Sequence, residues 1–509
     1  MCGIAARYGS ADPAAGRRML ERLVHRGPDD SGSVSLGERA WLGHTRLSIV
    51  DVEGGAQPLA TGDGTMWLVG NGEIYNHADV RQTLDGRLFS TRSDNEVALH
   101  LINEHGPDAL AELSGMYALI GAADDGQFVA ARDPIGIKPL YWARRGGEVR
   151  FASEMRAFDP SWLPDVEVFP PGHFWTPSRG LVRFEHAVPE RTLRSFPAPD
   201  SPDEPIPEDL LRETREVIVS AVDRQMMGDV PVGVFLSGGL DSTLVAAIAA
   251  EYLEARGRRL QTFAVGTDES SDLAAARAAA EYLGTEHREA VYTADELIEA
   301  LAPTVRSIES FDPSLVRSAV PNYLLARFTS EHVKVVLTGE GADEIFAGYG
   351  YYHRDFADAE LQAELVRTIE GLHNLNLQRA DRVTMAHGLE ARVPFLDREV
   401  IAFGLHVPIG WKAARDGVPE KRLLREAFTG WLPDELLWRK KEQFGTGSGA
   451  RDVLGETVSA KITDEEFEAE RRAIDPPLRT KEELAYFRIF REALPGLRPE
   501  DTIGRFATA

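Results

Sequence analysis

The stretch Val232-Gly-Val-Phe-Leu-Ser237-Gly238-Gly239-Leu240-Asp241-Ser242 decides how the second half of this chain folds. An apolar, alanine-rich run, Leu244 to Leu253, follows it. An apolar run, a turn of small residues and a helix-compatible run predict a buried parallel strand that leads into a crossover helix. We expect the turn to leave its backbone N–H groups free where the helix dipole favours an anion. The turn therefore predicts a phosphate site, and an ordinary strand-to-helix turn is the alternative.

Asp241 distinguishes this turn from a P-loop, because no lysine follows the glycines. A carboxylate beside phosphates needs a divalent cation between them, so Asp241 is interpreted as a Mg²⁺ ligand. The turn resembles the pyrophosphate loop of ATP pyrophosphatases, enzymes that adenylate a substrate and release pyrophosphate. The resemblance implies an ATP-binding set from this stretch: Leu236, Ser237, Gly238, Gly239, Leu240, Asp241 and Ser242.

The size and charge of the chain narrow its class. A chain of 509 residues is too long for one core and predicts two or three domains. Its 56 basic and 81 acidic residues give a formal charge of −25, which argues against nucleic acid or anionic membrane partners. No segment has the apolar length of a membrane span, and residues 1–20 lack a signal peptide's apolar stretch, so a cytoplasmic location is expected.

The single cysteine, Cys2, excludes an internal disulfide. If Met1 is removed, Cys2 carries both a thiol and a free α-amine, whose pKa lies near 8. A nucleophile and a general base then belong to one residue. A cysteine at this position by chance is the alternative.

Residues 1 to about 190 show a mixed α/β pattern, with helices expected near 14–24 and 94–105. Four clusters interrupt it: Cys2-Gly3-Ile4, His25-Arg26-Gly27-Pro28-Asp29, Arg46-Leu47-Ser48-Ile49-Val50-Asp51 and Asn71-Gly72-Glu73-Ile74-Tyr75-Asn76. In this order they resemble the class II glutamine amidotransferase domain. That resemblance implies an N-terminal-nucleophile hydrolase, with two stacked sheets between helical layers (αββα). The cluster from His25 to Asp29 is interpreted as a structural loop.

The resemblance also implies the role of each matching residue. Cys2 would attack the side-chain amide carbon of glutamine, giving a thioester and ammonia. The Asn71 side chain and the Gly72 N–H would form the oxyanion hole, and Arg46 would pair with the α-carboxylate. The implied glutamine-binding set is Arg46, Leu47, Ser48, Ile49, Val50, Asn71, Gly72, Glu73 and Asp94, with Asp94 on the α-ammonium. Alone, Asn71-Gly72 is also a common hairpin turn, and Arg46 fits an exposed strand position.

A Pro- and acid-rich run between Arg194 and Pro207 predicts a linker that neither packs nor continues a helix. We therefore predict a first domain at 2–190, a linker at 191–207 and a second domain at 208–509. The second domain opens with a helical run, 208–227, and alternates strand-like runs, such as 261–266 and 334–338, with helical ones. This alternation predicts an α/β domain with a parallel sheet whose strand ends bind ligands. Downstream of Phe356 the pattern is mainly helical.

The second domain resembles the synthetase domain of glutamine-dependent asparagine synthetases. The resemblance implies that Val265, Thr338 and Gly339 join the ATP site and that Asp241 and Asp343 hold Mg²⁺. Glu340 matches the family's acid/base residue, which takes a proton from ammonia. Lys421 and Lys441 are the cations chosen to neutralise the leaving pyrophosphate. Exposed lysines and paired acids in loops are more often simply solvated.

The expected activity is glutamine-dependent, ATP-driven amidation of a carboxylate through an acyl-adenylate, with a channel for ammonia between the two sites. Aspartate is the expected acceptor, and the implied acceptor-binding set is Ser314, Leu315, Asn376 and Arg379. Leu315 stands where the family carries a hydroxyl, and Asn376 where some members carry an acid. A different carboxylic acid in specialised metabolism is therefore the alternative, and a catalytically silent homologue is a further one. A homodimer is also compatible with the sequence.

Overall fold

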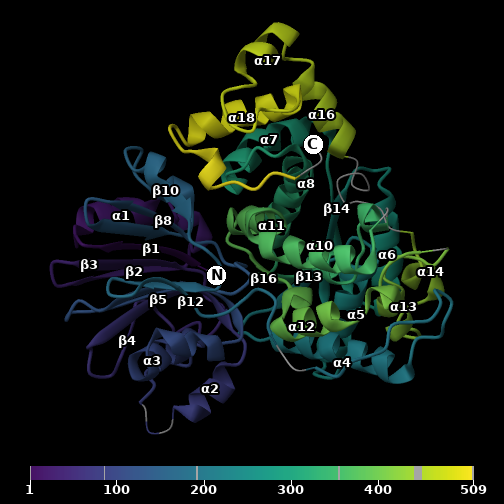
Figure 1. The fold of residues 1–509 in the computed structure, drawn as a ribbon, viewed down its shortest axis with the longest axis horizontal. Helices are drawn as coiled ribbons and strands as arrows, with labels where there is room; N and C mark the ends of the chain where they lie inside the picture. The colour runs from purple at the N-terminus through teal and green to yellow at the C-terminus, as the bar shows by residue number, and fades with distance from the viewer. Residues whose placement is uncertain are drawn as a thin grey trace.

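Two six-stranded antiparallel sheets face each other in the first part of the molecule (Figure 1). The computed structural model describes residues 2–84, 86, 88–190, 193–353, 356–415, 417–440 and 450–506. One sheet has the order β10-β8-β9-β1-β3-β2 and the other β12-β11-β7-β6-β5-β4. The strands of the first sheet are β1 (Cys2–Tyr8), β2 (Asp30–Leu36), β3 (Ala40–Arg46), β8 (Tyr141–Arg145), β9 (Glu148–Ala152) and β10 (Val166–Val168). Those of the second are β4 (Leu59–Ala60), β5 (Met66–Ile74), β6 (Gly115–Ala123), β7 (Phe128–Arg132), β11 (His173–Thr176) and β12 (Gly180–Arg183).

Apolar side chains fill the space between these sheets. Successive side chains of a strand point to opposite faces of its sheet, so every second residue points into this space. Ile4 and Leu42 from one sheet and Val69 and Ile120 from the other belong to one buried cluster. Helix α1 (Pro13–Glu21) covers the outer face of the first sheet, and α2 (His77–Thr83) and α3 (Asn95–His105) cover the second (Figure 1). The αββα arrangement confirms the predicted fold class. Helix α2 was not predicted.

A five-stranded parallel sheet organises the second part, in the order β15-β14-β13-β16-β17. Its strands are β13 (Val232–Phe235), β14 (Gln261–Gly266), β15 (Glu286–Val291), β16 (Val335–Leu337) and β17 (Glu390–Arg392). The strand predicted to precede the glycine turn is β13, and the helix predicted to follow it is α5 (Leu240–Glu254). Two strands were missed: β15 is largely polar, and β17 is only three residues long.

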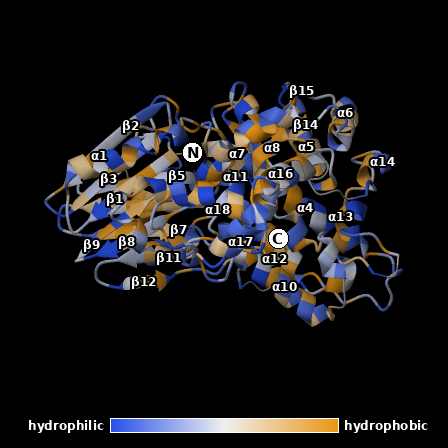
Figure 2. Cartoon of the chain, turned by 90° about the horizontal axis from the view of Figure 1, so that it is seen from above, coloured by the Kyte–Doolittle hydropathy of each residue, from blue (hydrophilic) through white to orange (hydrophobic). Residues whose placement is uncertain are grey.

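Helices surround this sheet and form the rest of the chain. Figure 2 shows apolar residues along α5 and α8 at the centre of this part. The helices are α4 (Glu208–Gln225), α6 (Ser271–Leu283), α7 (Ala294–Ile308), α8 (Pro313–Ser330), α9 (Ala342–Ile345), α10 (Asp358–Gly371), α11 (Asn376–Met385), α12 (Arg398–His406), α13 (Arg422–Ala427), α14 (Asp434–Leu437), α16 (Ala450–Ser459), α17 (Asp464–Glu470) and α18 (Lys481–Ala493). Among the described helices, none combines the length and apolarity that a bilayer crossing requires.

The two parts share apolar cores. Leu47, Ile49 and Met116 from the first part lie in the same buried cluster as Val234 and Leu244 from the second. Such continuous packing fixes the two parts against each other, in contrast to domains joined only by a flexible tether.

The expectation of an unpacked linker is wrong for the described part of that segment. Residues 193–207 form no helix or strand, but Phe196 and Ile206 are only 8% and 6% exposed. The indole of Trp411 donates a hydrogen bond to the Pro197 carbonyl at 2.9 Å. Prolines prevent regular structure, yet the apolar residues between them still bury their side chains.

Candidate active sites

The nucleophile predicted for glutamine hydrolysis lies at the start of β1. Cys2 is directly opposite Arg46 on the adjacent strand β3, so two predicted site residues are neighbours by strand register. The Cys2 side chain is buried, and burial raises the pKa of its thiol. A thiol with a raised pKa needs a base to become a nucleophile.

Asn71 reaches Cys2 from the facing sheet. Its Oδ1 accepts a hydrogen bond from the Cys2 backbone N at 3.0 Å. Its Nδ2 is buried and has no hydrogen-bond partner among the described residues. A buried amide donor without a partner is costly unless a ligand supplies an acceptor. The geometry therefore suits the predicted oxyanion donor.

Gly72 follows Asn71 on β5 with a φ of +144°. A Cβ at this position would lie 1.9 Å from the Met116 carbonyl oxygen, so only glycine fits the backbone here. The Asn95 side chain donates to the Gly72 carbonyl at 3.0 Å and further fixes this peptide.

Arg46 organises the predicted glutamine-binding loop. Its guanidinium donates to the carbonyl oxygens of Val50, Asp51 and Val52 at 3.2, 2.7 and 3.0 Å. Leu47 and Ile49 are buried, and the Ser48 N–H donates to Asp29 at 2.7 Å. These contacts give Arg46 a role in loop structure that the sequence interpretation did not include.

Two buried carboxylates complete this region. Asp94 accepts a hydrogen bond from the Ile74 N–H at 2.7 Å, and burial raises the pKa of Asp94. Glu73 is 4% exposed, and burial together with nearby Glu390 raises its pKa well above the ordinary value. Both lie within the set predicted to bind glutamine.

Arg26 was missed, because its cluster was interpreted as a structural loop. The Arg26 side chain is fully buried, and its Nε donates to the Cys2 carbonyl at 3.0 Å. Its other nitrogens contact Glu154 and, across the interface, Asp381 of α11 at 2.8 Å. A fully buried arginine needs a charged or polar partner, but the sequence does not reveal which residue that partner is.

The glycine turn of the second part lies at the carboxyl end of β13, as predicted. Gly238 has a φ of +70°, and a Cβ there would lie 2.5 Å from the Cβ of Ala275. The Ser237 N–H donates to the Ser242 hydroxyl at 3.2 Å, and the Gly239 N–H to the Ser237 hydroxyl at 3.4 Å. The expectation of free N–H groups is therefore wrong for these two, because serine hydroxyls accept from them.

The neighbouring strand ends surround this turn. Leu236 and Val265 are buried at the ends of β13 and β14, and the Leu236 N–H pairs with the Phe263 carbonyl at 2.8 Å. Gly339 packs closely, since a Cβ there would lie 2.9 Å from the Cβ of Asp241. The ATP-binding residues predicted from separate strands thus lie along one edge of the sheet.

Lys421 brings the two acidic turns together. Its Nζ lies 2.6 Å from Asp241 and 2.5 Å from Asp343. Burial lowers the pKa of Lys421, but these two carboxylates outweigh it and raise the pKa above its ordinary value. Mg²⁺ commonly takes one or two protein carboxylates and completes its shell with phosphate oxygens and water. Two carboxylates that reach a single cation fit that donor set.

A polar cluster lies beside the acidic turns. Glu340 is paired with Arg379 of α11. Asn376, at the start of the same helix, donates to Glu344 at 3.1 Å, and the Tyr349 hydroxyl donates to Glu344 at 2.7 Å. Burial and nearby Asp343 raise the pKa of Glu344 to about 7. Glu344 and Tyr349 were not predicted, although Glu344 directly follows Asp343.

The other predicted acceptor contacts are less favourable. Ser314 is partly exposed near the start of α8, but Leu315 is 0% exposed and belongs to an apolar core. In this structure Leu315 is not available to contact a ligand. The side chain of a helix residue next to a site can point into the core or into the site, and the residue type alone does not decide between these two directions.

Lys441 lies outside the described residues. Two positions before it in the sequence, Arg439 reaches the glycine turn, where its guanidinium donates to the Gly238 carbonyl at 3.2 Å and contacts Asp272 at 3.3 Å. Arg439 was not among the predicted site residues, because neighbouring basic residues look alike without geometry, and the role of Lys441 stays a prediction.

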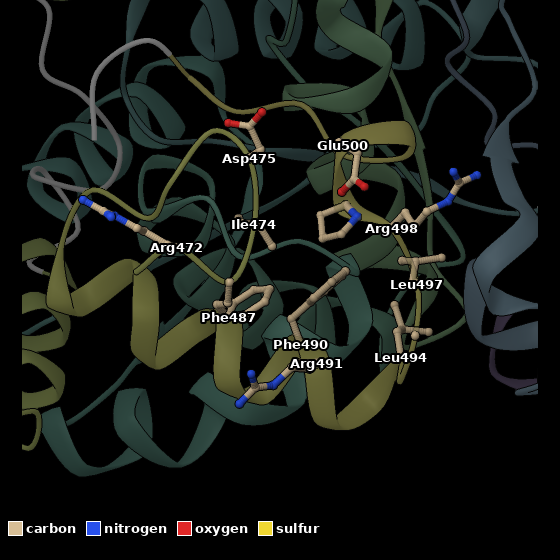
Figure 3. A pocket seen from close by; sticks show the side chains of 13 residues that line it. Arg472, Ile474, Asp475, Phe487, Phe490, Arg491, Leu494, Leu497, Arg498 and Glu500 are labelled. Carbon is tan, nitrogen blue, oxygen red and sulfur yellow. The ribbon is translucent and has the colours of Figure 1, made fainter. Parts of the chain in front are cut away.

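A hollow of about 510 Å³ lies elsewhere, beside α18 (Figure 3). Phe487 and Phe490 line it together with Arg491 and Arg498. None of the predicted site residues that the structure describes lines this hollow.

Comparison with known proteins assigns both parts. Residues 1–171 match the glutamine amidotransferase domain, and residues 213–360 and 355–499 match asparagine synthase. A probable glutamine-hydrolysing asparagine synthetase of Schizosaccharomyces pombe is 39% identical, over 97% of this chain and 94% of its own. The chain belongs to the glutamine-hydrolysing asparagine synthetase family. Asparagine synthetase 3 of Arabidopsis thaliana is 42% identical to this family member, over 88% of this chain and 79% of its own.

Among solved structures, a glutamine phosphoribosylpyrophosphate amidotransferase from B. subtilis has a TM-score of 0.32. It is 21% identical and covers 57% of this chain and 65% of its own, a likeness too weak to add to the assignment. The family assignment confirms the predicted enzyme class and implies the use of ATP.

Proposed function

We propose that this enzyme transfers the amide nitrogen of glutamine to the side-chain carboxylate of aspartate, consuming ATP and releasing AMP and pyrophosphate. The observation that carries the proposal is the convergence of Asp241 and Asp343 on Lys421, within 2.7 Å. This convergence assembles the charges for a nucleotide phosphate site in a chain that also carries the Cys2 site.

In the first site, Cys2 Sγ attacks the glutamine side-chain carbon, and the carbon–nitrogen bond breaks as ammonia leaves. In the structure, the Cys2 nitrogen is a backbone N–H that donates to Asn71 Oδ1. Once Met1 is removed, this nitrogen is a free α-amine, which accepts the thiol proton and returns it to the leaving ammonia. The Nδ2 of Asn71, which has no partner among the residues that the structure describes, supports a role as oxyanion donor, together with the Gly72 N–H. Water then hydrolyses the thioester to glutamate.

In the second site, an aspartate carboxylate oxygen attacks the α-phosphorus of ATP, and pyrophosphate leaves. Asp241 and Asp343 would hold Mg²⁺, which when bound neutralises phosphate charge. Lys421, already between these carboxylates, would turn to the leaving pyrophosphate. Ammonia then displaces AMP from the acyl-adenylate, and Glu340 takes the proton that the nitrogen loses.

The polar cluster favours an acceptor that carries an ammonium group. Asn376 replaces an acid that some family members carry, but it is hydrogen-bonded to the carboxyl group of Glu344. Glu344 thus supplies a carboxylate where an α-ammonium would need one, and Arg379 supplies a cation for an α-carboxylate. This pairing supports aspartate over an acid without an amino group.

The test is pyrophosphate release across a panel of carboxylic acids with ATP, Mg²⁺ and either glutamine or ammonium. We expect aspartate to give stoichiometric AMP, pyrophosphate and asparagine. If aspartate is inert while another acid responds, the assigned acceptor is wrong.

Cys2→Ala provides the second arm of the same assay. It should abolish synthesis from glutamine and keep synthesis from ammonium, since only the first site loses its nucleophile. Loss of both activities in a folded variant would contradict the two-site proposal.

A further inference from the structure

Arg392 is a buried cation at the end of the edge strand β17, and its side chain points toward the first part of the molecule. It is 0% exposed. Its Nη1 donates to the Gln225 carbonyl at 2.6 Å, and its Nε to Glu390 at 2.5 Å. These contacts leave Nη2 facing Glu73 Oε1 at 3.7 Å.

Glu73 belongs to the predicted glutamine pocket and directly follows Gly72. Its Oε2, like Arg392 Nη2, is buried without a hydrogen-bond partner among the described residues. Glu390 and Asp94 add further negative charge nearby, and Arg392 opposes their effect on the pKa of Glu73. A buried carboxylate in such surroundings depends on a facing cation.

The backbone of Arg392 is tied to the other site. Its carbonyl oxygen accepts from the Thr338 N–H at 2.9 Å and from the Thr338 hydroxyl at 3.3 Å. Thr338 begins the turn that carries Gly339 and Glu340. One residue therefore contacts the glutamine pocket through its side chain and the nucleotide turn through its main chain.

We propose that Arg392 is a positioning residue for glutamine hydrolysis, supplied by the synthetase domain, whose guanidinium holds the Glu73 carboxylate in the glutamine pocket. This inference rests on the proposed function, because it assumes that glutamine binds beside Cys2 and Glu73. It explains why a three-residue strand of the second domain carries a fully buried arginine toward the first.

The test compares Arg392→Met with the wild-type enzyme in glutamine hydrolysis and in ammonium-dependent synthesis. We expect the KM for glutamine to rise about tenfold or more, because Glu73 loses its facing cation. Ammonium-dependent synthesis should stay within about twofold, since the Arg392 carbonyl that holds Thr338 is unchanged by the substitution.

A double variant separates action through Glu73 from a general structural role. If Arg392 works by holding Glu73, Arg392→Met combined with Glu73→Gln should raise the KM no further than Glu73→Gln alone. If the two effects on KM multiply instead, Arg392 does not act through Glu73 and the inference is overturned. Should Arg392→Met not fold, Arg392→Lys serves in the same cycle, because its ammonium cannot keep all the guanidinium contacts.

Arg398→Met is the matched control. Arg398 also crosses from the second domain to the first, where it pairs with Glu185 and donates to the Leu113 carbonyl at 3.0 Å. We expect this control to leave the KM for glutamine unchanged, and an equal rise in both variants would overturn the inference.

Cys2→Ala distinguishes the two proposals. If Cys2→Ala still hydrolyses glutamine, the proposed function fails. If Cys2→Ala is inactive but Arg392→Met binds glutamine normally, only the inference on Arg392 fails.

Discussion

The two sites of this enzyme hold their polar groups in different ways. At the first site, strand register sets Cys2 opposite Arg46, and the facing sheet presents an Asn71 amide donor that has no partner in the described part of the chain. At the second site, charges at strand ends pair with each other, as Lys421 does with Asp241 and Asp343. The first site is preorganised by β-sheet pairing, whereas under the proposed function the second exchanges its internal ion pairs for substrate charges.

Of the substitutions that test this comparison, Asp241→Asn should have the largest effect, and that effect should be confined to the second site. We expect pyrophosphate release to fall at least about a thousandfold, equivalent to about 4 kcal/mol, because a charged ligand near the phosphates becomes neutral. Glutamine hydrolysis should stay within about twofold, since strand register at the first site is untouched. The measurement is pyrophosphate and glutamate formation in parallel.

Asp209→Asn is the control, because Asp209 is a more exposed carboxylate on α4 that pairs with Arg194. Normal pyrophosphate release by Asp241→Asn would show that this carboxylate has no part in the nucleotide site. Removing Mg²⁺ with a chelator should reproduce the split between the two activities.

Asn71→Ala should have an intermediate effect on the preorganised site. We expect kcat for glutamine hydrolysis to fall about 10²- to 10³-fold, with ammonium-dependent synthesis unchanged, because an oxyanion donor is lost. Steady-state kinetics with each nitrogen source measure this difference. Asn103→Ala on the exposed face of α3 is the control, and a matching loss there would point to general damage.

Leu315→Thr should have the smallest functional effect and tests whether residue type alone defines the acceptor site. Leu315 is 0% exposed, so a hydroxyl there would lower the free energy of unfolding by about 1–3 kcal/mol. We expect acceptor preference to stay within about twofold. Urea unfolding measures the change in stability, and the panel of carboxylic acids measures acceptor preference. A changed preference would show that Leu315 does contribute to the acceptor site.

Apolar periodicity and glycine turns are local signals, so they predicted the parallel α/β part, whereas the layered αββα part was implied by the family resemblance. The strand, turn and helix around Ser237 follow from one short stretch, and β14 follows from its own apolar run. β15 and β17 could not be predicted, because β15 is largely polar and β17 has only three residues, so contacts with the rest of the fold and not a local apolar run stabilise them. The apolar contacts of Phe196 were missed for the same reason.

Site residues inside motifs were predicted more readily than their partners. Cys2, Asn71 and Asp241 lie in short clusters with a chemical rationale. Arg26 lies in a recognised cluster too, but the importance of Arg26, like that of Arg392, depends on contacts across the interface, which composition does not encode. Leu315 shows the converse, because a matching position need not face the site.

The shared apolar cores have a consequence for engineering this enzyme. An isolated first half would expose Leu47, Ile49 and Met116, which now pack in one cluster with Val234. A chimera that exchanges either half must therefore carry the matching interface along with the catalytic motifs. The smallest part of this enzyme that can be transferred to another protein therefore contains both halves and both sites.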